Sequence, residues 1–452
     1  MDQVLWKNII DFNLDDPLSE YGFSTRLENE NWWTVNFARD AILEYKKFMY
    51  LAAVSDAMVS PSEIVDVVWH QHLIFTQSYK DFCSVLGKKV AHIPSTHNKS
   101  EFDKFKSAKE RTQKLYTENF GTPPAAFWEY SDIYEPLSMP KSAFKVDAIA
   151  SAGTLILVPA IFAAYFCLRP LYVTINNPYF VFGYIAIVFI CIISLEFYNR
   201  SRLNDIISGW QKDAFVFNLS ALELVYLNKN QINDVIHGVV NQLILNKRIS
   251  VTPDQTLAVN DSSGVKSPIE FCVLENISVN PQIYYPSLLR LLALKPVFNK
   301  TVRALDGFKK YFNRSVQFIK LFTLNFIALS FVFLLGAVRL ITGIVRDRPV
   351  TIIAVIVIGC LILMIGFLYR LTVSMGSVIL PQFYKDSILP KRSVDNDWEW
   401  EYFLMGTAVF ATSFAPLTSF ASGSDGGGGG DSGSSCGSSC GGGGSCGGCG
   451  GD

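Results

Sequence analysis

Four long apolar runs stand out in the pattern of hydrophobic and polar positions along the chain. They cover residues 148–168, 179–198, 321–345 and 350–369, and each reaches the roughly 20 residues that a helix needs to cross a bilayer. Short loops join the first run to the second and the third to the fourth, so we predict two transmembrane hairpins. The alternative is a set of buried helices in a soluble protein, but four such runs in two close pairs are hard to place in one core.

The segment 402–421 is a fifth apolar stretch, although Pro416 and many small residues interrupt it. As a fifth span it would place the C-terminal tail on the opposite side of the membrane. Without it, the tail stays on the same side as the regions that precede each hairpin. The sequence leaves both possibilities open.

Polar residues are rare within the four predicted spans. Arg339, Asn325 and Glu196 lie near span ends, where their side chains are expected to reach the lipid headgroups. The spans therefore give little indication of an ion or substrate path, and a transport function is not favoured.

Residues 1–135 precede the spans and show helical periodicity. The stretch "SPSEIVDVVWHQHLIFTQSYKDFC" predicts one helix, with Ser60, Pro61 and Glu63 arranged as a start signal and Gly87 as the end. Apolar residues then recur at spacings of three and four, which directs one helical face toward a core. That face comprises Val65, Val68, His72, Phe75, Tyr79, Phe82 and Leu86.

Residues 199–320, between the hairpins, predict a small α+β unit. Ser220 and Glu223 have the spacing of a capping box at the start of one helix, and a second helix covers 231–246. Two strand-like runs come next, at 248–251 and 256–259. This order is typical of a winged helix. Because the second helix has almost no Lys or Arg to contact phosphates, we expect a protein-interaction or packing module, and nucleic-acid binding is not expected.

The predicted fold is therefore mainly α. It comprises an N-terminal helical domain, four transmembrane helices in two hairpins, a winged-helix-like middle domain, and a disordered Gly/Cys-rich tail at 422–452. Half of all residues are apolar and 17% are charged, so the rest of the chain is expected to fold. The net charge of -1 provides no general attraction to nucleic acid.

Basic residues beside the spans predict the orientation. Lys141 and Lys145 precede the first span, and Arg200 and Arg202 come after the second, so the N-terminal and middle domains are expected in the cytoplasm. Two arginines in the second hairpin loop weaken this signal. The N-terminus lacks the pattern of a cleaved signal peptide. Together these features predict a multi-pass protein of a bacterial inner membrane.

Candidate chemistry centres on the histidines of the helix predicted at 60–87. His70 shares a helical face with Asp66, one turn earlier, whereas His72 lies about 200° around the helix on the apolar face. His92 lies after the helix and a short loop, and it is expected to fold back toward His72. Asp66, His70, His72 and His92 are therefore candidate metal ligands, with zinc as the candidate ion.

Two other interpretations of these residues remain open. His72 can be a hydrogen-bonded core histidine and His70 a surface or capping group, or the histidines can be catalytic. The region contains no H-E-x-x-H sequence, so no catalytic residue is assigned.

The tail carries Cys436, Cys440, Cys446 and Cys449 in the spacing C-x3-C-x5-C-x2-C. Four thiolates on one short segment can wrap a zinc ion or a cluster. The alternatives are covalent modification, disulfide formation, and a plain extension with no bound metal.

Several segments carry a family resemblance. In order, "EYKKFMYLA", the helix quoted above, "LGKKVAHIP" and "LYTENFGTPPAAFW" resemble the N-terminal region of glycine-rich domain-containing proteins over about 130 residues. The resemblance implies an all-α domain without established enzymatic chemistry. Residues 200–452 are similar to a bacterial membrane-protein family of unknown function, on the basis of residues 219–249 and the tail.

We therefore expect an integral membrane protein that acts in interaction or scaffolding, with the lipid bilayer and other proteins as partners. The alternative function is a metal-dependent membrane enzyme that uses the histidine cluster.

Overall fold

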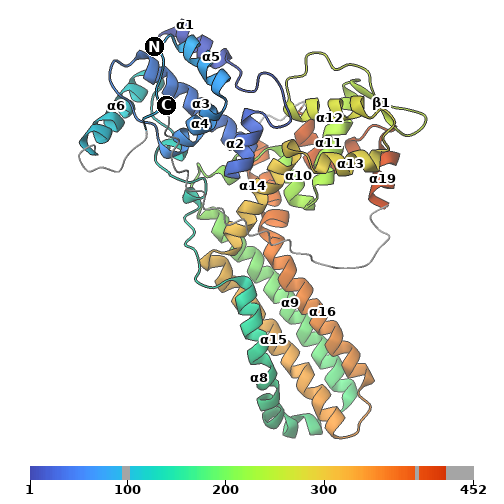
Figure 1. Cartoon of the computed structure of the whole chain (residues 1–452). Coiled ribbons are helices and arrows are strands. Elements are labelled where there is room, and N and C mark those ends of the chain that lie inside the picture. The colour runs from blue at the N-terminus through green and yellow to red at the C-terminus, as the bar shows by residue number, and fades with distance from the viewer. Residues whose placement is uncertain (94–101, 392–396, 424–452) are drawn as a thin grey trace, which may run out of the picture.

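The computed structural model describes residues 1–93, 102–391 and 397–423. Four long helices form a bundle, and the other elements gather at one end of it (Figure 1). We call this second part the head; it comprises the described residues of 1–145, 209–315 and 380–423. The predicted tail from residue 424 onward, with its four cysteines, lies outside the described residues; residues 422 and 423 belong to the last helix described.

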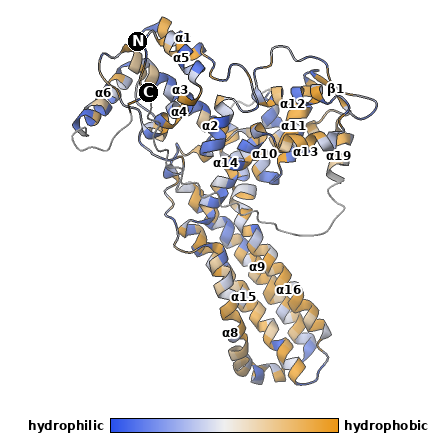
Figure 2. Cartoon of the chain, in the orientation of Figure 1, coloured by the Kyte–Doolittle hydropathy of each residue, from blue (hydrophilic) through white to orange (hydrophobic). Residues whose placement is uncertain are grey.

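The bundle confirms the four predicted spans and extends each of them. Its helices are α8 (Val146–Thr174), α9 (Asn177–Ser208), α15 (Val316–Val345) and α16 (Thr351–Ser374). Its surface is mainly apolar along most of its length (Figure 2). α15 packs against the other three helices and has half of its most apolar window buried, whereas the corresponding window of α8 has none. The four helices therefore have the length, composition and apolar surface that suit a multi-pass membrane protein.

Both hairpins enter the bundle from the head. The segments before α8 and α15 pair through their backbones: Ser142 N–H donates to Arg314 O at 2.8 Å, and Val316 N–H donates to Pro140 O at 2.9 Å. α8 and α15 therefore start side by side, and both hairpin loops lie at the far end of the bundle (Figure 1).

The N-terminal part of the head is helical, as predicted. Its elements are α1 (Gln3–Asp11), α2 (Phe23–Asn31), α3 (Val35–Val54), α4 (Glu63–Ile74), α5 (Thr76–Leu86), α6 (Phe102–Phe120), α7 (Ala125–Trp128) and the short η2 (Glu135–Leu137).

The prediction of one continuous helix from Ser60 was wrong in two respects. The cap is Ser62, whose Oγ accepts from Val65 N–H at 3.2 Å and donates to Phe127 O, so the cap also joins two helices. The helix then breaks at Phe75, whose backbone leaves the helical region (φ -86°, ψ 66°), and restarts as α5. Gly87 ends α5 in a left-handed conformation, as expected.

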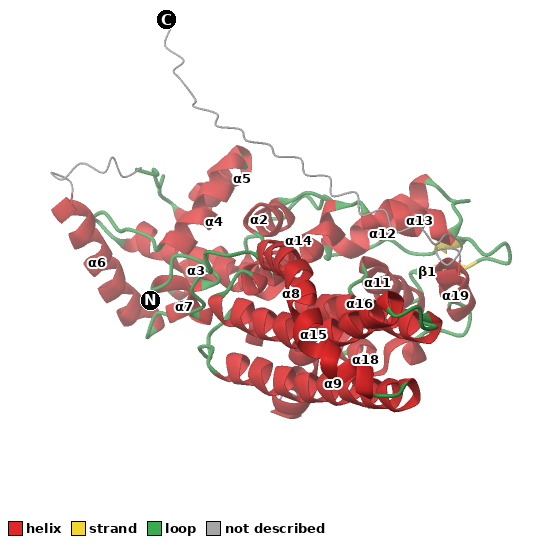
Figure 3. Cartoon of the chain, turned by 90° about the horizontal axis from the view of Figure 1, so that it is seen from below, coloured by secondary structure: helices red, strands yellow, loops and turns green. Residues whose placement is uncertain are grey.

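The middle part of the head contains the predicted helix pair and β-hairpin. Its elements are η3 (Phe215–Phe217), α10 (Ala221–Lys229), α11 (Ile232–Leu245), β1 (Ile249–Val251), β2 (Leu257–Val259), α12 (Pro268–Val279), α13 (Tyr285–Ala293) and α14 (Pro296–Asn313). The Ser220–Glu223 capping box is present. β1 and β2 pair antiparallel, with Ser250 opposite Ala258, and they are the two strands in the described residues (Figure 3). α11 packs against α10, α12, α13 and α14.

The fifth-span alternative at 402–421 was wrong. The segment forms two short helices, α18 (Trp398–Met405) and α19 (Ala415–Gly423), separated by η7 (Gly406–Val409). Both pack on the middle part of the head. The Tyr402 hydroxyl donates to Asp234 O at 2.8 Å, and Ala411 N–H donates to Asn241 Oδ1 at 2.8 Å. Gly406 takes a positive φ of 61°, which ends α18 and turns the chain away from its axis.

α16 continues out of the bundle and fixes it to the head. The helical path runs through η4 (Met375–Ile379), α17 (Leu380–Phe383), η5 (Tyr384–Ile388) and η6 (Leu389–Lys391). Its anchor is Tyr384, whose hydroxyl donates to Val216 O at 2.9 Å and accepts from Leu219 N–H at 2.6 Å.

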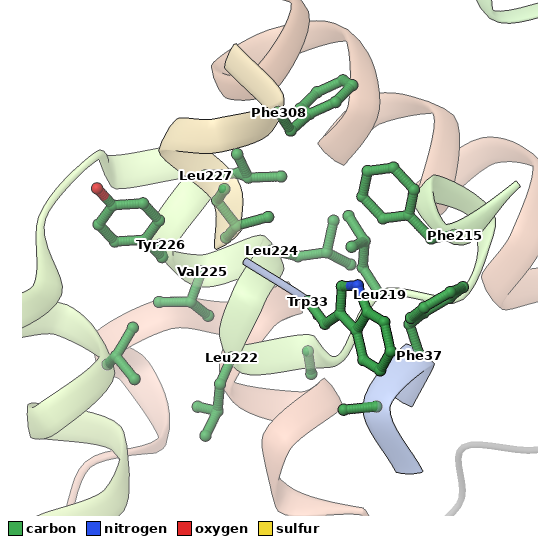
Figure 4. Packing of buried hydrophobic residues seen from close by; sticks show 14 of the residues in the cluster. Trp33, Phe37, Phe215, Leu219, Leu222, Leu224, Val225, Tyr226, Leu227 and Phe308 are labelled. Atoms are coloured by element: carbon green, nitrogen blue, oxygen red, sulfur yellow. The ribbon is translucent and has the colours of Figure 1, made fainter. Parts of the chain in front are cut away.

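The two parts of the head share one core (Figure 4). Trp33 and Phe37 from the N-terminal part lie beside Phe215 and Leu219 from the middle part. Glu223, 1% exposed, accepts from Ser220 N–H with one oxygen and from Val35 N–H with the other, so it caps helices of both parts. Movement of one part against the other would take the Val35 N–H away from this buried carboxylate, which opposes such movement.

Candidate metal centre

Two helical residues and one loop residue converge on the surface of the head. Asp66 and His70 lie one turn apart on α4, on the face that points away from the core. His92 lies in the segment after α5. The ligand atoms of the three side chains all lie within 4.8 Å of one another.

Asp66 bridges the two histidines. Its Oδ1 is 3.1 Å from His92 Nε2, and its Oδ2 is 3.4 Å from His70 Nδ1. The imidazole rings of His70 and His92 lie 4.4 Å apart between centroids. Two imidazole nitrogens and one carboxylate oxygen therefore face a common point, with the spacing that ligands around one small cation adopt.

The loop that carries His92 is held in place by buried contacts. The Tyr79 hydroxyl donates to Val90 O at 2.6 Å and accepts from the Trp69 indole N–H at 3.1 Å. Trp69 also packs edge-on against the His92 ring, with 4.6 Å between centroids. The Lys88 ammonium donates to two backbone carbonyl oxygens at the end of α3. His92 is therefore positioned before any ligand binds.

His72 is separate from this cluster. It is fully buried, with Nδ1 2.8 Å from the Tyr45 hydroxyl and Nε2 3.1 Å from the Ser78 hydroxyl, so both ring nitrogens are occupied. Burial lowers its pKa to about 4, and the nearby Lys46 ammonium contributes in the same direction. The structure thus places three of the four predicted ligands together and the fourth in the core.

The expected approach of His92 to His72 was wrong. The loop after α5 returns over the outer face of α4 because the inner face is filled by aromatic rings, those of Phe23, Tyr45 and Phe82 around His72. His92 reaches Asp66 and His70 instead. The i, i+4 spacing of Asp66 and His70 predicted their pairing, but no sequence signal fixed the path of the loop.

A cavity of about 380 Å³ adjoins the three side chains. Apolar walls from Met58, Trp69 and Phe105 surround it, and Glu63 adds a carboxylate. Glu63, Asp66 and His70 lie at the helical spacing of three and four, so Glu63 belongs to the same face. The sequence carried this signal, although Glu63 was interpreted only as a capping residue.

The cluster and its cavity define what the arrangement can do. A zinc ion held by two imidazoles and one carboxylate keeps a fourth position for water or a ligand, and this position is characteristic of catalytic rather than structural zinc sites. Zinc lowers the pKa of bound water to about 7, and a nearby carboxylate can accept a proton from it. The second candidate ligand set, the four tail cysteines, lies outside the described residues.

Comparisons with known proteins give one family match, in the region that contains this cluster, and one distant relative. Residues 32–117 match the family described as UCP032817-like. The chain is similar to the glycine-rich domain-containing protein 1 of Arabidopsis thaliana, with 24% identity over 127 residues. That match covers 26% of this chain and 15% of the relative. No solved structure matches. The likeness therefore covers only part of each chain, and the matched family region, 32–117, includes Asp66, His70 and His92.

Proposed function

We propose that this membrane protein binds a divalent metal ion, with zinc as the fitting ion, at Asp66, His70 and His92. The single observation that carries the proposal is the convergence of three ligand atoms within 4.8 Å beside a cavity. A surface ion pair would need only Asp66 and one histidine. Here the loop after α5 adds a second histidine, His92, to the same carboxylate.

The fixed geometry supports binding rather than chance proximity. His92 is only 16% exposed at its side chain and is held by Trp69, so little side-chain entropy remains to be lost when a metal binds. The cavity leaves space for a fourth ligand of small size. We propose that the bound ion activates water or polarises a substrate oxygen there, which is the chemistry of a metal-dependent hydrolase.

Metal content of purified full-length protein tests the proposal. Because the tail cysteines can also bind zinc, the measurement uses a variant with all four tail cysteines changed to serine. We expect about one zinc per chain in this variant after dialysis against trace zinc, and a loss of most of it in Asp66→Asn or His92→Ala.

Asp81→Asn is the matched control, because Asp81 is an exposed carboxylate on α5 that accepts hydrogen bonds from the Gln77 amide. This control should retain the metal. Equal zinc content in Asp66→Asn, His92→Ala and the parent, with all proteins folded by circular dichroism, would contradict the site.

A second function, interaction or scaffolding at the membrane, is favoured by the position of the head. The head is large and lies at one end of the bundle, which suits a platform for protein partners (Figure 1). We propose that it faces the cytoplasm from a bacterial inner membrane, as the basic residues beside the first hairpin indicate. A protein that binds no metal in the assay above would act in this second way.

A further inference from the structure

A cavity at the far end of the bundle is lined by three arginines and by the ends of α8, α9, α15 and α16. It measures about 330 Å³ and lies where the α8–α9 loop meets the α15–α16 loop. Arg339, Arg346 and Arg348 line it, together with Asn176 and Asn177.

Arg339 reaches the end of the bundle that carries the hairpin loops. It is 7% exposed, and its guanidinium donates to Tyr172 O, to Ile175 O at 2.8 Å, and to Asn177 Oδ1 at 2.9 Å. It also lies over the Phe180 ring, 4.9 Å from the centroid. These partners orient the guanidinium, but none of them carries a negative charge.

The cavity therefore has an excess of positive charge. Among the described residues, no carboxylate forms an ion pair with Arg339, Arg346 or Arg348. Asp347 is the acidic residue of the same loop, so three positive charges stand against one negative charge. The first turns of α9 and α16 and the last turns of α8 and α15 all lie at this end, so their helix dipoles oppose one another and the arginines supply the positive charge.

The position of the cavity along the bundle indicates which anion could reach it. α16 starts at Thr351 beside the cavity, and the ion pair between Arg370 and Glu196, 2.7 Å long, lies about 19 residues further along it. At 1.5 Å per residue this separation is close to 30 Å, the thickness of the hydrocarbon layer. The cavity and the ion pair are therefore separated by the distance expected between the two faces of a bilayer.

We propose that this cavity binds a phosphate group, and that the headgroup of an anionic phospholipid in the far leaflet supplies it. Arginine is suited to this role because its planar fork binds two phosphate oxygens at once. Arg346 and Arg348, both exposed, contact the phosphate, and Arg339 fixes the floor of the site. Lipid binding would then explain the two arginines in the α15–α16 loop, which run against the orientation that the basic residues beside the first hairpin indicate.

Native mass spectrometry of delipidated full-length protein in detergent tests the site. The probes are phosphatidylglycerol and diacylglycerol with the same acyl chains. We expect the parent to retain phosphatidylglycerol over diacylglycerol, and the double variant Arg346→Gln/Arg348→Gln to retain it at least about tenfold less well. The control, Lys104→Gln/Lys106→Gln on exposed positions of α6, loses the same charge and should behave as the parent.

A second measurement distinguishes a lipid from free phosphate. Thermal unfolding in detergent is monitored with inorganic phosphate added at constant ionic strength. Stabilisation of the parent but not of the double variant, without a preference for phosphatidylglycerol, assigns the cavity to soluble phosphate and overturns the lipid assignment. If neither probe distinguishes the double variant from the parent, the cavity is not a phosphate site.

Discussion

At the scale of single residues, His70 and His72 lie two positions apart on α4 but have different roles, one as a candidate metal ligand and one as a core residue. His70 faces water beside Asp66, and His72 faces the core between Tyr45 and Ser78. A buried histidine with both nitrogens hydrogen-bonded to hydroxyl groups is stable only in its neutral form, since charging it would bury a cation without a counter-ion. The helical period fixes this division of roles.

Because burial lowers the pKa of His72, we expect the free energy of unfolding to fall at acidic pH. The unfolded chain takes up a proton on this histidine near pH 6.5, whereas the folded chain takes it up near pH 4. Above pH 6.5 both states are neutral, so the contribution is complete. It is lost as the pH falls from 6.5 to 4, by at most about 3 kcal/mol. Thermal unfolding of the detergent-solubilised protein across this pH range measures the loss.

His237, whose pKa burial also lowers to about 4, contributes with the same sign, so each histidine is tested alone. The variant His72→Gln keeps hydrogen-bonding atoms. Between pH 6.5 and 4 its unfolding should take up about one proton fewer than that of the parent, so its unfolding free energy should depend less on pH. An unchanged pH slope in a folded His72→Gln protein would refute the assignment. His237→Gln gives the corresponding slope for the middle part of the head.

At the scale of elements, the bundle is joined by a polar pair rather than by apolar packing alone. Asn325 of α15 was expected to reach the lipid headgroups from near a span end, but its side chain is fully buried against Asn199 of α9. Each amide donates to the other, at 2.7 and 2.9 Å. In a low-dielectric surrounding such a reciprocal pair fixes the register of two helices, because any slip breaks both hydrogen bonds between the amides.

This pair predicts a specific pattern in a double-mutant cycle. The single variant Asn325→Leu leaves the buried Asn199 amide without its hydrogen-bond partner and should lower the free energy of unfolding by about 1–2 kcal/mol. The single variant Asn199→Leu should lower it by a similar amount. The double variant Asn199→Leu/Asn325→Leu leaves no stranded amide and should cost less than the sum of the two. Unfolding in mixed detergent micelles gives the three free energies. Strict additivity would show that the two side chains do not interact.

At the scale of the whole molecule, the backbone pairing between the starts of α8 and α15 places all parts of the head at the same end of the bundle. Both hairpins leave the head in the same direction, so the N-terminal helices, the middle part and α18–α19 share one side of the membrane. Buried contacts such as the double cap by Glu223 then combine these regions into one body.

Cysteine labelling tests this arrangement. In a background without native cysteines, Asp347→Cys in the far loop and Lys212→Cys in the head are exposed to a membrane-impermeant maleimide in intact cells. We expect Asp347→Cys to react at once and Lys212→Cys only after permeabilisation. The opposite result would reverse the orientation, and equal labelling of both would contradict the four-span topology.

The sequence by itself determined the features that depend on local period and composition. Four runs of apolar residues fixed the bundle, the Ser220–Glu223 spacing fixed a helix start, and the i, i+4 spacing placed Asp66 beside His70. Each of these is a consequence of the geometry of one helix or of the solvent that a helix requires.

Only the tertiary structure decided where separate segments meet. The break at Phe75, the return of His92 to Asp66, the burial of Arg339 and the docking of α18 and α19 on the head all depend on contacts between residues far apart in sequence. Such contacts are selected by the shape and charge of a partner surface, and no single segment carries that information.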